Sequence, residues 1–464
     1  MDASIPTLIT MWAGRADATR PALQTEGRTV SYAELAREML SRGSAFLDAA
    51  GPVVVADPDP IELALTTFGV LAAGKSPLLV NARYPPATID AITAASGGDN
   101  AAAYHPRAPL ERPVDVPSDA DGILLTTSGS EGLPKIVRRS RFADAYGVLS
   151  TTLRGWPIRR DSRLWAPVPV ASGVIYALVL GALVSGATAV LDRFDATTAG
   201  TFVRESKIDG VYFVPTMIRL ILRDASFRGE DFRDLKALLW AGEPMDTATQ
   251  DEVIDAVGDI LWTGYGSTEV LSCTSASPED RHRYGASTSG RPTVMHDVRI
   301  VGRDGEPLPP EQEGEIETRG IDAYRGYLGG ADRTPLQWHR TGDFGRLDKF
   351  GALHVDGRRS MVVNIGGNRV SPEEPAHALR QLPPVEHAVV VAVEDPVWGN
   401  RLHGFVVPRP GQLIDADAIL ASLRKVLPAA KVPRSLSVID KLPIDASGKL
   451  SLTTLRGWAQ QGVQ

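Results

Sequence analysis

The sequence predicts an α/β fold with a large N-terminal domain of stacked, parallel-rich sheets, a small antiparallel subdomain and a small α+β C-terminal domain. Three observations support this prediction. The chain has 464 residues, about three times the length of a typical single domain, so more than one hydrophobic core is expected. Helix-like and strand-like segments alternate through most of the chain, which is typical of parallel sheets covered by helices. After Asp297, short strands separated by Gly, Pro and Asp replace that alternation.

The alternation begins near the N-terminus. The predicted pairs are helix 31–50 with strand 53–56, and helix 61–73 with strand 77–80. Residues 97–121 contain four prolines and little periodicity, so we expect a long surface connection there. A strand at 211–215 precedes another helix-like stretch, which continues the α/β pattern.

One apolar run has two interpretations. Residues 171–191 carry no charge over 21 positions, which is long enough to cross a bilayer. Glycines interrupt the run at three positions, and its last five residues resemble a short strand. We therefore predict a core helix over about 174–184 followed by a turn and a buried strand, rather than a membrane span.

The sequence of the C-terminal third predicts an antiparallel subdomain and a terminal unit. The short strands of the antiparallel subdomain are expected at 298–302, 314–318 and 352–355. The terminal unit is expected to contain a strand at 362–365, a helix after 371–374 and a strand at 387–393. We therefore predict two domains, residues 1–357 and residues 358–464, the second having the size of a small independent domain.

Composition and charge exclude several classes of protein. Hydrophobic residues make up 43% of the chain and charged residues 23%, which excludes disorder, collagen and coiled coil. The net charge of −7 offers no excess positive charge, so we predict neither nucleic acid nor membrane partners. The single cysteine, Cys273, excludes an intramolecular disulfide and a Cys-rich zinc site. The first residues lack the pattern of a secretory signal, so we expect a cytoplasmic protein.

The strongest local signal is a loop that follows the apolar strand at 123–126. Glycines let backbone N–H groups approach phosphate oxygens, hydroxyls donate further hydrogen bonds, and a lysine adds positive charge. The loop residues expected to bind a nucleotide triphosphate are Thr127, Ser128, Gly129, Ser130, Gly132 and Lys135. The loop lacks the ending of a Walker A motif and the glycines of a dinucleotide fingerprint. Taken alone, it could also be an ordinary Ser/Gly turn.

Further motifs in a fixed order extend this signal over nearly the whole chain. The matching segments are 127–135, 240–244, 263–269, 314–316, 340–343, 357–358, 366–370 and 443–449. Through this ordered set the chain resembles the adenylate-forming superfamily of acyl-CoA synthetases, carrier-protein adenylation domains and luciferases. The order and spacing of the set, rather than any one motif, support the resemblance.

The resemblance implies an ATP site. Tyr265 corresponds to a tyrosine that stacks on adenine, although a tyrosine between two glycines is otherwise often a packing residue. Asp343 corresponds to the aspartate whose oxygens accept both ribose hydroxyls, and Arg358 to an arginine that supports the same ribose. The residues implied around the nucleotide, besides the phosphate loop, are Gly242, Glu243, Pro244, Gly264, Tyr265, Gly266, Ser267, Asp343 and Arg358.

The resemblance also implies three catalytic residues. The Thr268 hydroxyl is expected to contact the α-phosphate, and the Glu269 carboxylate to help hold Mg²⁺, a hard ion that prefers oxygen ligands. Lys449 is expected to reach the substrate carboxylate and the α-phosphate, where its charge offsets the negative charge that gathers during transfer. No protein-held zinc site is predicted, because the eight histidines show no ligand spacing.

The implied reaction has two steps. A carboxylate attacks the α-phosphorus of ATP and expels pyrophosphate, and a thiol then attacks the acyl-adenylate. The expected cofactors are ATP and Mg²⁺, with CoA or carrier-protein phosphopantetheine as the acceptor. The expected partners are a small-molecule carboxylic acid and, for the second acceptor, an acyl carrier protein. The resemblance further implies that the C-terminal domain is a mobile lid that rotates between the steps.

Four positions depart from the family pattern. Glu131 places a carboxylate in the phosphate loop, Ile136 replaces a common glycine after the lysine, and Ser360 replaces a charged hinge residue. Val170 stands where amino-acid adenylation domains carry an aspartate for the α-amine. We therefore predict that α-amino acids are poor substrates.

The positions beside these motifs predict the lining of the acyl pocket. Its residues are expected to be Val170, Gly173, Tyr212, Phe213, Trp240, Ala241, Trp262 and Thr263. Aromatic and small residues favour an aryl or short apolar acid over a long chain. Two other functions stay open: a ligase that delivers the adenylate to an amine or another non-thiol nucleophile, and a non-catalytic adenylate-binding protein.

Overall fold

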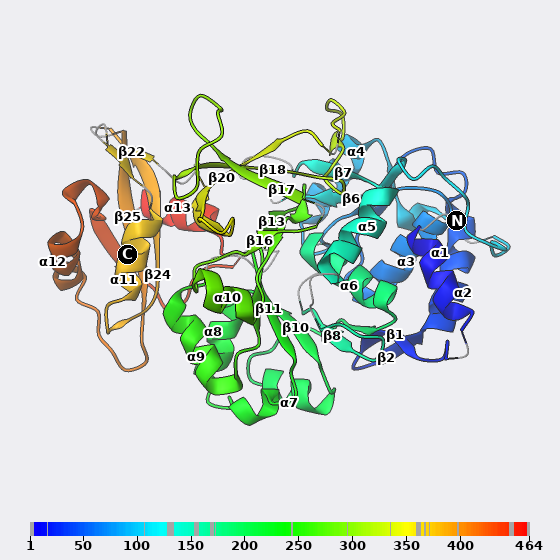
Figure 1. Ribbon diagram of the computed structural model, residues 1–464, viewed down its shortest axis with the longest axis horizontal. Helices are drawn as coiled ribbons and strands as arrows, with labels where there is room; N and C mark the ends of the chain where they lie inside the picture. Colours follow the sequence, from blue (N-terminus) through cyan, green and yellow to red (C-terminus); the bar gives the residue numbers. More distant parts are fainter. Residues whose placement is uncertain are drawn as a thin grey trace. The chain divides into compact units, whose positions relative to one another are not determined.

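The computed structural model describes residues 4–15, 17–105, 107–127, 134–152, 157–167, 171, 173–242, 245–294, 296–334, 336–358, 363–365, 368–370, 372–396, 399–444 and 450–461. The chain divides into two units (Figure 1). The first unit comprises Met1–Thr341 and Gly345–Val355, and the second comprises Gly342–Phe344 and Asp356–Gln464. Compactness alone does not define where a domain begins, so the division into 1–357 and 358–464 stays a prediction.

A seven-stranded sheet forms one layer of the first unit. Its strands are, in spatial order, β12 (Leu261–Thr263), β11 (Ala237–Trp240), β10 (Gly210–Phe213), β8 (Arg163–Trp165), β9 (Thr188–Val190), β1 (Pro21–Thr25) and β2 (Arg28–Ser31). The strands from β12 to β1 run parallel, and β2 pairs antiparallel with β1. Parallel neighbours need crossover connections, which the alternating helices supply.

A six-stranded sheet forms a second layer. Its strands are, in spatial order, β19 (Gly326–Tyr327), β7 (Ile136–Ser140), β6 (Asp121–Thr126), β4 (Pro77–Leu79), β3 (Val53–Val55) and β5 (Asp99–Asn100). The four strands from β6 to β5 are parallel. The strand β7 pairs antiparallel with β6, and β19 pairs antiparallel with β7. The phosphate loop therefore connects two neighbouring strands, β6 and β7, near one edge of this sheet.

Helices of the first unit begin at side-chain caps or at prolines in several places. They are α1 (Ile5–Ala13), α2 (Tyr32–Gly43), α3 (Pro60–Ala72), α4 (Pro86–Ser96), α5 (Arg141–Thr152), α6 (Gly173–Ser185), α7 (Ala199–Glu205), α8 (Pro215–Arg223), α9 (Thr247–Val257) and α10 (Pro278–Tyr284). The Ser31 hydroxyl and the Glu34 carboxylate form a reciprocal capping box at α2. Asp59 caps α3, and Asp246 caps α9.

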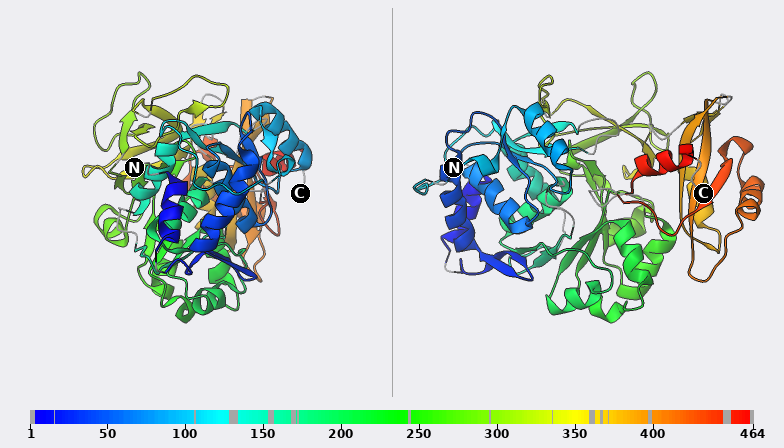
Figure 2. Two further views of the ribbon diagram at one scale, coloured as in Figure 1. Left: turned by 90° about the vertical axis from the view of Figure 1, so that its right-hand side faces the viewer. Right: turned by 180° about the vertical axis from the view of Figure 1, so that it is seen from behind.

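The central hydrophobic core lies between the two sheets. It joins Leu23 of the seven-stranded sheet and Leu125 of the six-stranded sheet with buried side chains of α2, α3 and α6. A second core packs α7, α8 and α9 against the other face of the seven-stranded sheet. A third core packs Ile92 of α4 against the other face of the six-stranded sheet. Helices and sheets therefore alternate in layers (Figure 2).

Short strands after α10 form the antiparallel subdomain. The four-stranded sheet has the order β17 (His296–Val301), β18 (Gly314–Gly320), β20 (His339–Leu347) and β21 (Leu353–Arg358). In this sheet β17 and β18 are antiparallel, with Val298 opposite Thr318. Two small two-stranded sheets precede it: the hairpin of β13 (Gly266–Ser267) with β14 (Leu271–Ser272), and the pair of β15 (Thr274–Ser275) with β16 (Arg291–Pro292), which lie on either side of α10 in the chain.

The second unit is an α+β arrangement. Its strands are β22 (Val363–Ile365) paired with β23 (Asn368–Val370), and the three-stranded sheet β24 (Val385–Asp395), β25 (Gly399–Pro408) and β26 (Ser435–Val438). Its helices are α11 (Glu373–Arg380), α12 (Ala416–Val426) and α13 (Leu452–Gln461). Helices α11 and α12 share one core with the three-stranded sheet, and α13 packs on a separate core that includes Phe405.

These observations confirm the predicted fold class. The helix predicted at 31–50 is shorter than expected, since α2 ends at Gly43 and a 3₁₀ turn, Ser44–Phe46, follows. The connection predicted at 97–121 contains the short strand β5 and a second 3₁₀ turn. The apolar run beginning at residue 171 contains α6 and β9, and none of the described helices is long and apolar enough to cross a membrane.

Candidate functional site

The predicted catalytic pair, Thr268 and Glu269, lies in the turn of the hairpin formed by β13 and β14. Gly266 stands opposite Ser272, and a Cβ atom at Gly266 would lie 1.5 Å from the carbonyl oxygen of Leu271. Only glycine allows so close an approach of the two strands. The Glu269 N–H donates to the Ser267 hydroxyl at 3.3 Å, which fixes the main chain of the turn.

Tyr265 enters this hairpin from the strand β12. Its N–H donates to the Thr274 hydroxyl at 3.1 Å, and its carbonyl accepts from the Cys273 N–H at 2.9 Å. The partly buried ring packs against a small cluster around Val270 and another around Ile316. The ring is thus supported by these hydrophobic clusters, and its position in the predicted adenine site stays a prediction.

Glu269 is held by two contacts with the segment that follows β18. The Tyr324 N–H donates to the Glu269 carbonyl at 2.8 Å, and the Tyr327 hydroxyl donates to Glu269 Oε1 at 2.9 Å. Burial, together with a smaller contribution from the Glu269 charge, raises the pKa of the Tyr327 hydroxyl above its usual value. The hydroxyl therefore keeps its proton and donates to the carboxylate.

The phosphate loop is described at its two ends. The Thr127 N–H donates to the Lys135 carbonyl at 3.0 Å, which closes the base of the loop. The Lys135 ammonium lies over the ring of Tyr327, with Nζ 5.0 Å from the ring centroid. Ser128, Gly129, Ser130 and Gly132, with the departure Glu131, lie outside the described residues. Ile136, another departure, is buried as the first residue of β7.

The N-terminus of α6 lies beside the same hairpin. A Cβ atom at Gly173 would lie 3.4 Å from Leu125 Cδ1 and 3.7 Å from the Cα atom of Thr268. Gly173 therefore leaves room between the end of β6, the start of α6 and the Thr268 turn. The positive end of the α6 dipole favours negative charge in this region.

The structure divides the predicted acyl-pocket residues between two faces of the seven-stranded sheet. Tyr212, Ala241 and Trp262 pack on the central core between the sheets. Phe213 and Trp240 pack on the other face, in the core of α7, α8 and α9. Side chains alternate along a strand, so Tyr212 and Phe213 cannot line one pocket. The predicted set is therefore not brought together as a whole.

The remaining predicted residues have varied positions. Thr263 is buried, and its main chain exchanges two hydrogen bonds with Ala276, of 3.0 and 2.8 Å. Gly264 is close to the Thr274 carbonyl, Gly242 has a positive φ of 90°, and Asp343 is buried in β20. Outside the described residues lie Val170, Glu243, Pro244 and Lys449, the departure Ser360 and the side chain of Arg358.

The donor set suits a magnesium ion that binds mainly to phosphate. Among the described residues, no group of three or more His, Cys, Asp or Glu side chains could hold a metal ion. Mg²⁺ usually takes one or two carboxylates together with substrate phosphates and water, rather than an all-protein cage. A single carboxylate, Glu269, beside the end of the phosphate loop fits that mode of binding.

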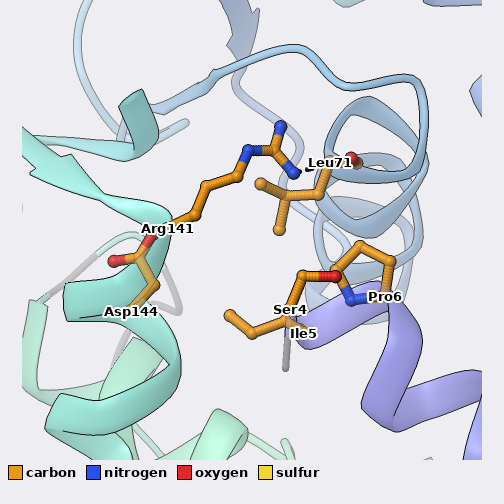
Figure 3. Close-up of a pocket in the computed structure, with 6 residues that line it drawn as sticks. All are labelled: Ser4, Ile5, Pro6, Leu71, Arg141 and Asp144. Atoms are coloured by element: carbon orange, nitrogen blue, oxygen red, sulfur yellow. Dashed lines mark hydrogen bonds between the residues drawn. The ribbon is translucent and has the colours of Figure 1, made fainter. Parts of the chain in front are cut away.

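The recess in Figure 3 does not belong to this site. It is lined by Ser4, Ile5, Pro6, Leu71, Arg141 and Asp144. The Arg141 guanidinium donates to the Leu71 carbonyl at 3.0 Å and to the Lys75 carbonyl at 2.8 Å. The recess is thus a gap among structural side chains of α1, α3 and α5.

Tyr327 and Tyr324 are not among the site residues predicted from the sequence. Both follow β18, and Tyr327 reaches Glu269, which is 58 residues earlier in the chain. The sequence feature that marks these two residues is a pair of tyrosines three residues apart after a predicted strand. Nothing in that spacing indicates which distant side chain they contact.

Comparisons with known proteins identify the family of this chain. The family model described as "AMP-binding enzyme" matches residues 97–328, and the model described as "AMP-binding enzyme C-terminal domain" matches residues 376–449. A feruloyl-CoA synthase of an Amycolatopsis species is 30% identical over 417 residues, which cover 88% of this chain and 79% of that protein. An indoleacetate–CoA ligase of Aromatoleum aromaticum is 29% identical over 341 residues, covering 72% of this chain and 66% of that protein.

A solved structure shows the same fold. O-succinylbenzoate coenzyme A synthetase from Bacillus subtilis, in complex with ATP and a magnesium ion, has a TM-score of 0.82 and 22% sequence identity. The match covers 98% of this chain and 99% of that one. At this level of identity the likeness establishes the fold.

Proposed function

The chain belongs to the AMP-binding enzyme family as an AMP-forming acid–thiol ligase, and on this premise we propose that it activates an aryl or short apolar carboxylic acid. The proposed product of the first step is an acyl-adenylate, with pyrophosphate released. In the second step the acyl group passes to the thiol of CoA or of a carrier-protein phosphopantetheine.

The observation that carries this proposal is the convergence of three segments on one place. The base of the phosphate loop at Lys135, the Glu269 carboxylate and the start of α6 at Gly173 meet around the hairpin that contains Thr268. A lysine, a hydroxyl and a helix N-terminus provide positive charge and donors for a polyphosphate, and a carboxylate supplies an oxygen ligand for its metal ion.

In the proposed first step these groups align the reactants rather than form a covalent intermediate. The Thr268 hydroxyl binds the α-phosphate, and Lys135 binds the outgoing phosphates. Mg²⁺, when bound, supplies charge neutralisation of the phosphates at Glu269. In our proposal the Lys449 ammonium binds the α-phosphate, and its charge favours the transition state more than the ground state.

The face shared by Tyr212, Ala241 and Trp262 supports the proposed class of acid. These side chains are apolar or aromatic, and the Tyr212 hydroxyl is occupied by a 3.1 Å hydrogen bond to the Ala241 carbonyl. A flat acid can stack against such a surface. The feruloyl-CoA synthase and the indoleacetate–CoA ligase also bear names of aryl acids.

Pyrophosphate release across a panel of acids tests the proposal. We expect aryl acids to exceed long-chain fatty acids and α-amino acids, and we expect the Lys449→Ala variant to lose at least about a hundredfold in rate. Mass spectrometry of products formed with CoA, with a carrier protein and with an amine then identifies the acceptor. Near-normal adenylation by Lys449→Ala, or no pyrophosphate with any acid, would contradict the proposal.

A further inference from the structure

We propose that Tyr327 is a positioning residue that holds the Lys135 ammonium and the Glu269 carboxylate apart, so that both stay available to magnesium-bound ATP. The inference rests on the proposed function, since it assumes that the two charged groups serve one nucleotide. Tyr327 itself contacts neither the phosphates nor the reacting atoms in this proposal.

Strand pairing fixes the main chain of Tyr327 beside the end of the phosphate loop. In the pairing of β19 with β7, Tyr327 stands opposite Val137, two residues after Lys135. The Leu328 N–H donates to the Ile136 carbonyl at 2.8 Å, and the Arg325 N–H donates to the Arg138 carbonyl at 2.8 Å. The main-chain position from which the Tyr327 ring extends is therefore fixed next to Lys135.

The hydroxyl end of the ring determines the orientation of Glu269. The Tyr327 hydroxyl donates to Oε1 at 2.9 Å, and the Tyr324 N–H holds the Glu269 carbonyl at 2.8 Å. One contact fixes the main chain and the other fixes the side chain. Because an ionised carboxylate only accepts hydrogen bonds, the direction of the Tyr327 bond is unambiguous.

The face of the ring determines the position of Lys135. Its Nζ lies 5.0 Å from the ring centroid, within the range in which a cation is attracted to an aromatic face. The lysine is exposed and has a flexible stem, so the ring restricts a charge that would otherwise sample many rotamers.

The two charges do not neutralise each other. No ion pair joins Lys135 to Glu269 in the described part of the chain, although both contact the same ring. A direct ion pair would have to be broken before either group could serve a nucleotide. Because Lys135 lies on the face of the Tyr327 ring and Glu269 at its hydroxyl end, this arrangement avoids the free-energy cost of breaking such an ion pair.

A second tyrosine supports the ring. Tyr324 packs edge-to-face against Tyr327 with centroids 5.4 Å apart, and the Tyr324 hydroxyl lies 3.2 Å from Nδ1 of His339. Tyr327 therefore has neighbours that oppose rotation of its ring.

Two substitutions separate the effect of the Tyr327 hydroxyl on Glu269 from the effect of its ring on Lys135. Tyr327→Phe keeps the ring and removes the hydroxyl, and Tyr327→Leu removes both. ATP affinity is measured by isothermal titration calorimetry in excess Mg²⁺ and again in EDTA. We expect Tyr327→Phe to weaken ATP binding about tenfold in Mg²⁺ and less than about twofold in EDTA. The reason is that the lost hydroxyl donates to Glu269, the proposed metal ligand. Tyr327→Leu should weaken binding under both conditions.

A matched control is Tyr104→Phe. The Tyr104 hydroxyl also donates to a carboxylate, that of Asp99 at 3.0 Å, but on an exposed surface outside the site. We expect this variant to bind ATP like the wild type. Equal losses for Tyr327→Phe in Mg²⁺ and in EDTA, or no loss in either, would overturn the proposal.

The same measurements distinguish this proposal from the proposed function. If the wild type binds ATP with a Mg²⁺ dependence that Tyr327→Phe lacks, but releases no pyrophosphate with any acid, the positioning role holds and the proposed reaction fails. If the wild type releases pyrophosphate and Tyr327→Phe keeps its full Mg²⁺ dependence, the reaction holds and the positioning role fails.

Discussion

Tyr212 and Phe213 are adjacent in β10, yet their side chains pack into different cores on opposite faces of the seven-stranded sheet. The same division separates Trp262 from Trp240, one strand away. Only the face that carries Tyr212 and Trp262 is directed to the interior between the two sheets. The acid pocket that we propose therefore belongs to that face.

The two tryptophans provide a matched test of this assignment. We expect Trp262→Ala to change the ratio of kcat/KM values between a small and a large aryl acid by about tenfold or more, because it enlarges the proposed pocket. Trp240→Ala should leave that ratio unchanged and instead lower the free energy of unfolding by about 3–5 kcal/mol, since it opens a cavity in the other core. Steady-state kinetics with both acids and urea unfolding measure the two effects.

A shift in the acid ratio for Trp240→Ala, with none for Trp262→Ala, would reverse the assignment of the faces. Trp240→Phe and Trp262→Phe repeat the comparison with smaller cavities, in case an alanine variant does not fold.

A buried ion pair in the first unit predicts a pH-dependent mutational effect. The Arg139 guanidinium donates to Asp144 Oδ1 at 3.1 Å, and both side chains are almost fully excluded from solvent. Burial raises the pKa of Asp144 to about 6, although Arg139 and the Ile123 N–H favour its charged form. Arg139→Met leaves the carboxylate unpaired, so we expect a loss of about 3–5 kcal/mol in the free energy of unfolding at pH 8.

That loss should be smaller at pH 5, because a raised pKa means that the folded protein then holds Asp144 neutral. In the double variant Arg139→Met/Asp144→Asn the amide still accepts from the Ile123 N–H, and we expect most of the lost stability to return. Urea unfolding at both pH values checks this. An equal loss at pH 5 and pH 8, or no recovery in the double variant, would contradict the interpretation.

In the second unit, His403 predicts a loss of folding stability as the pH falls. Its Nδ1 lies 2.7 Å from the Ser435 hydroxyl and its Nε2 3.0 Å from the Ser437 hydroxyl. Burial, and secondarily the Arg401 charge, lower the pKa of His403 to about 4. The unfolded chain binds the proton near pH 6.5 and the folded chain does not, so stability is lost as the pH falls from 6.5 towards 4.

Hydrogen exchange of the β25 amides measures this effect. We expect the wild type to lose about 2 kcal/mol of local stability over that range relative to His403→Gln, which cannot titrate. If local stability depended on pH in the same way in the two proteins, the result would contradict a lowered pKa of His403 in the folded state.

The sequence predicts the order of helices and strands well because their periodicities differ and turns mark their ends. The run beginning at residue 171 is an example, since its glycines and its final strand-like residues predict the α6 and β9 that the structure contains. The motifs at 127–135 and 263–269 predict polar loops, and Lys135 of the first and Glu269 of the second both contact Tyr327. Their role in binding a nucleotide stays a prediction.

The faces of the central strands could not be predicted in the same way. Strands such as β10 and β11 are buried on both sides, so their sequences are apolar throughout and do not mark one face. The sequence alone therefore places Phe213 and Trp240 in the same predicted pocket as Tyr212 and Trp262. The contact of Tyr327 with Glu269 depends on the pairing of β19 with β7, which no local pattern indicates.

Transfer of a labelled oxygen tests the central claim most directly. If the acid attacks the α-phosphorus, one oxygen of its carboxylate forms the new P–O bond and stays on AMP when the thiol displaces it. We predict that an acid carrying ¹⁸O in its carboxylate, chosen from the active members of the panel, yields AMP with one ¹⁸O atom and unlabelled pyrophosphate by mass spectrometry. Unlabelled AMP, or ¹⁸O in inorganic phosphate beside ADP, would contradict an acyl-adenylate mechanism for this protein.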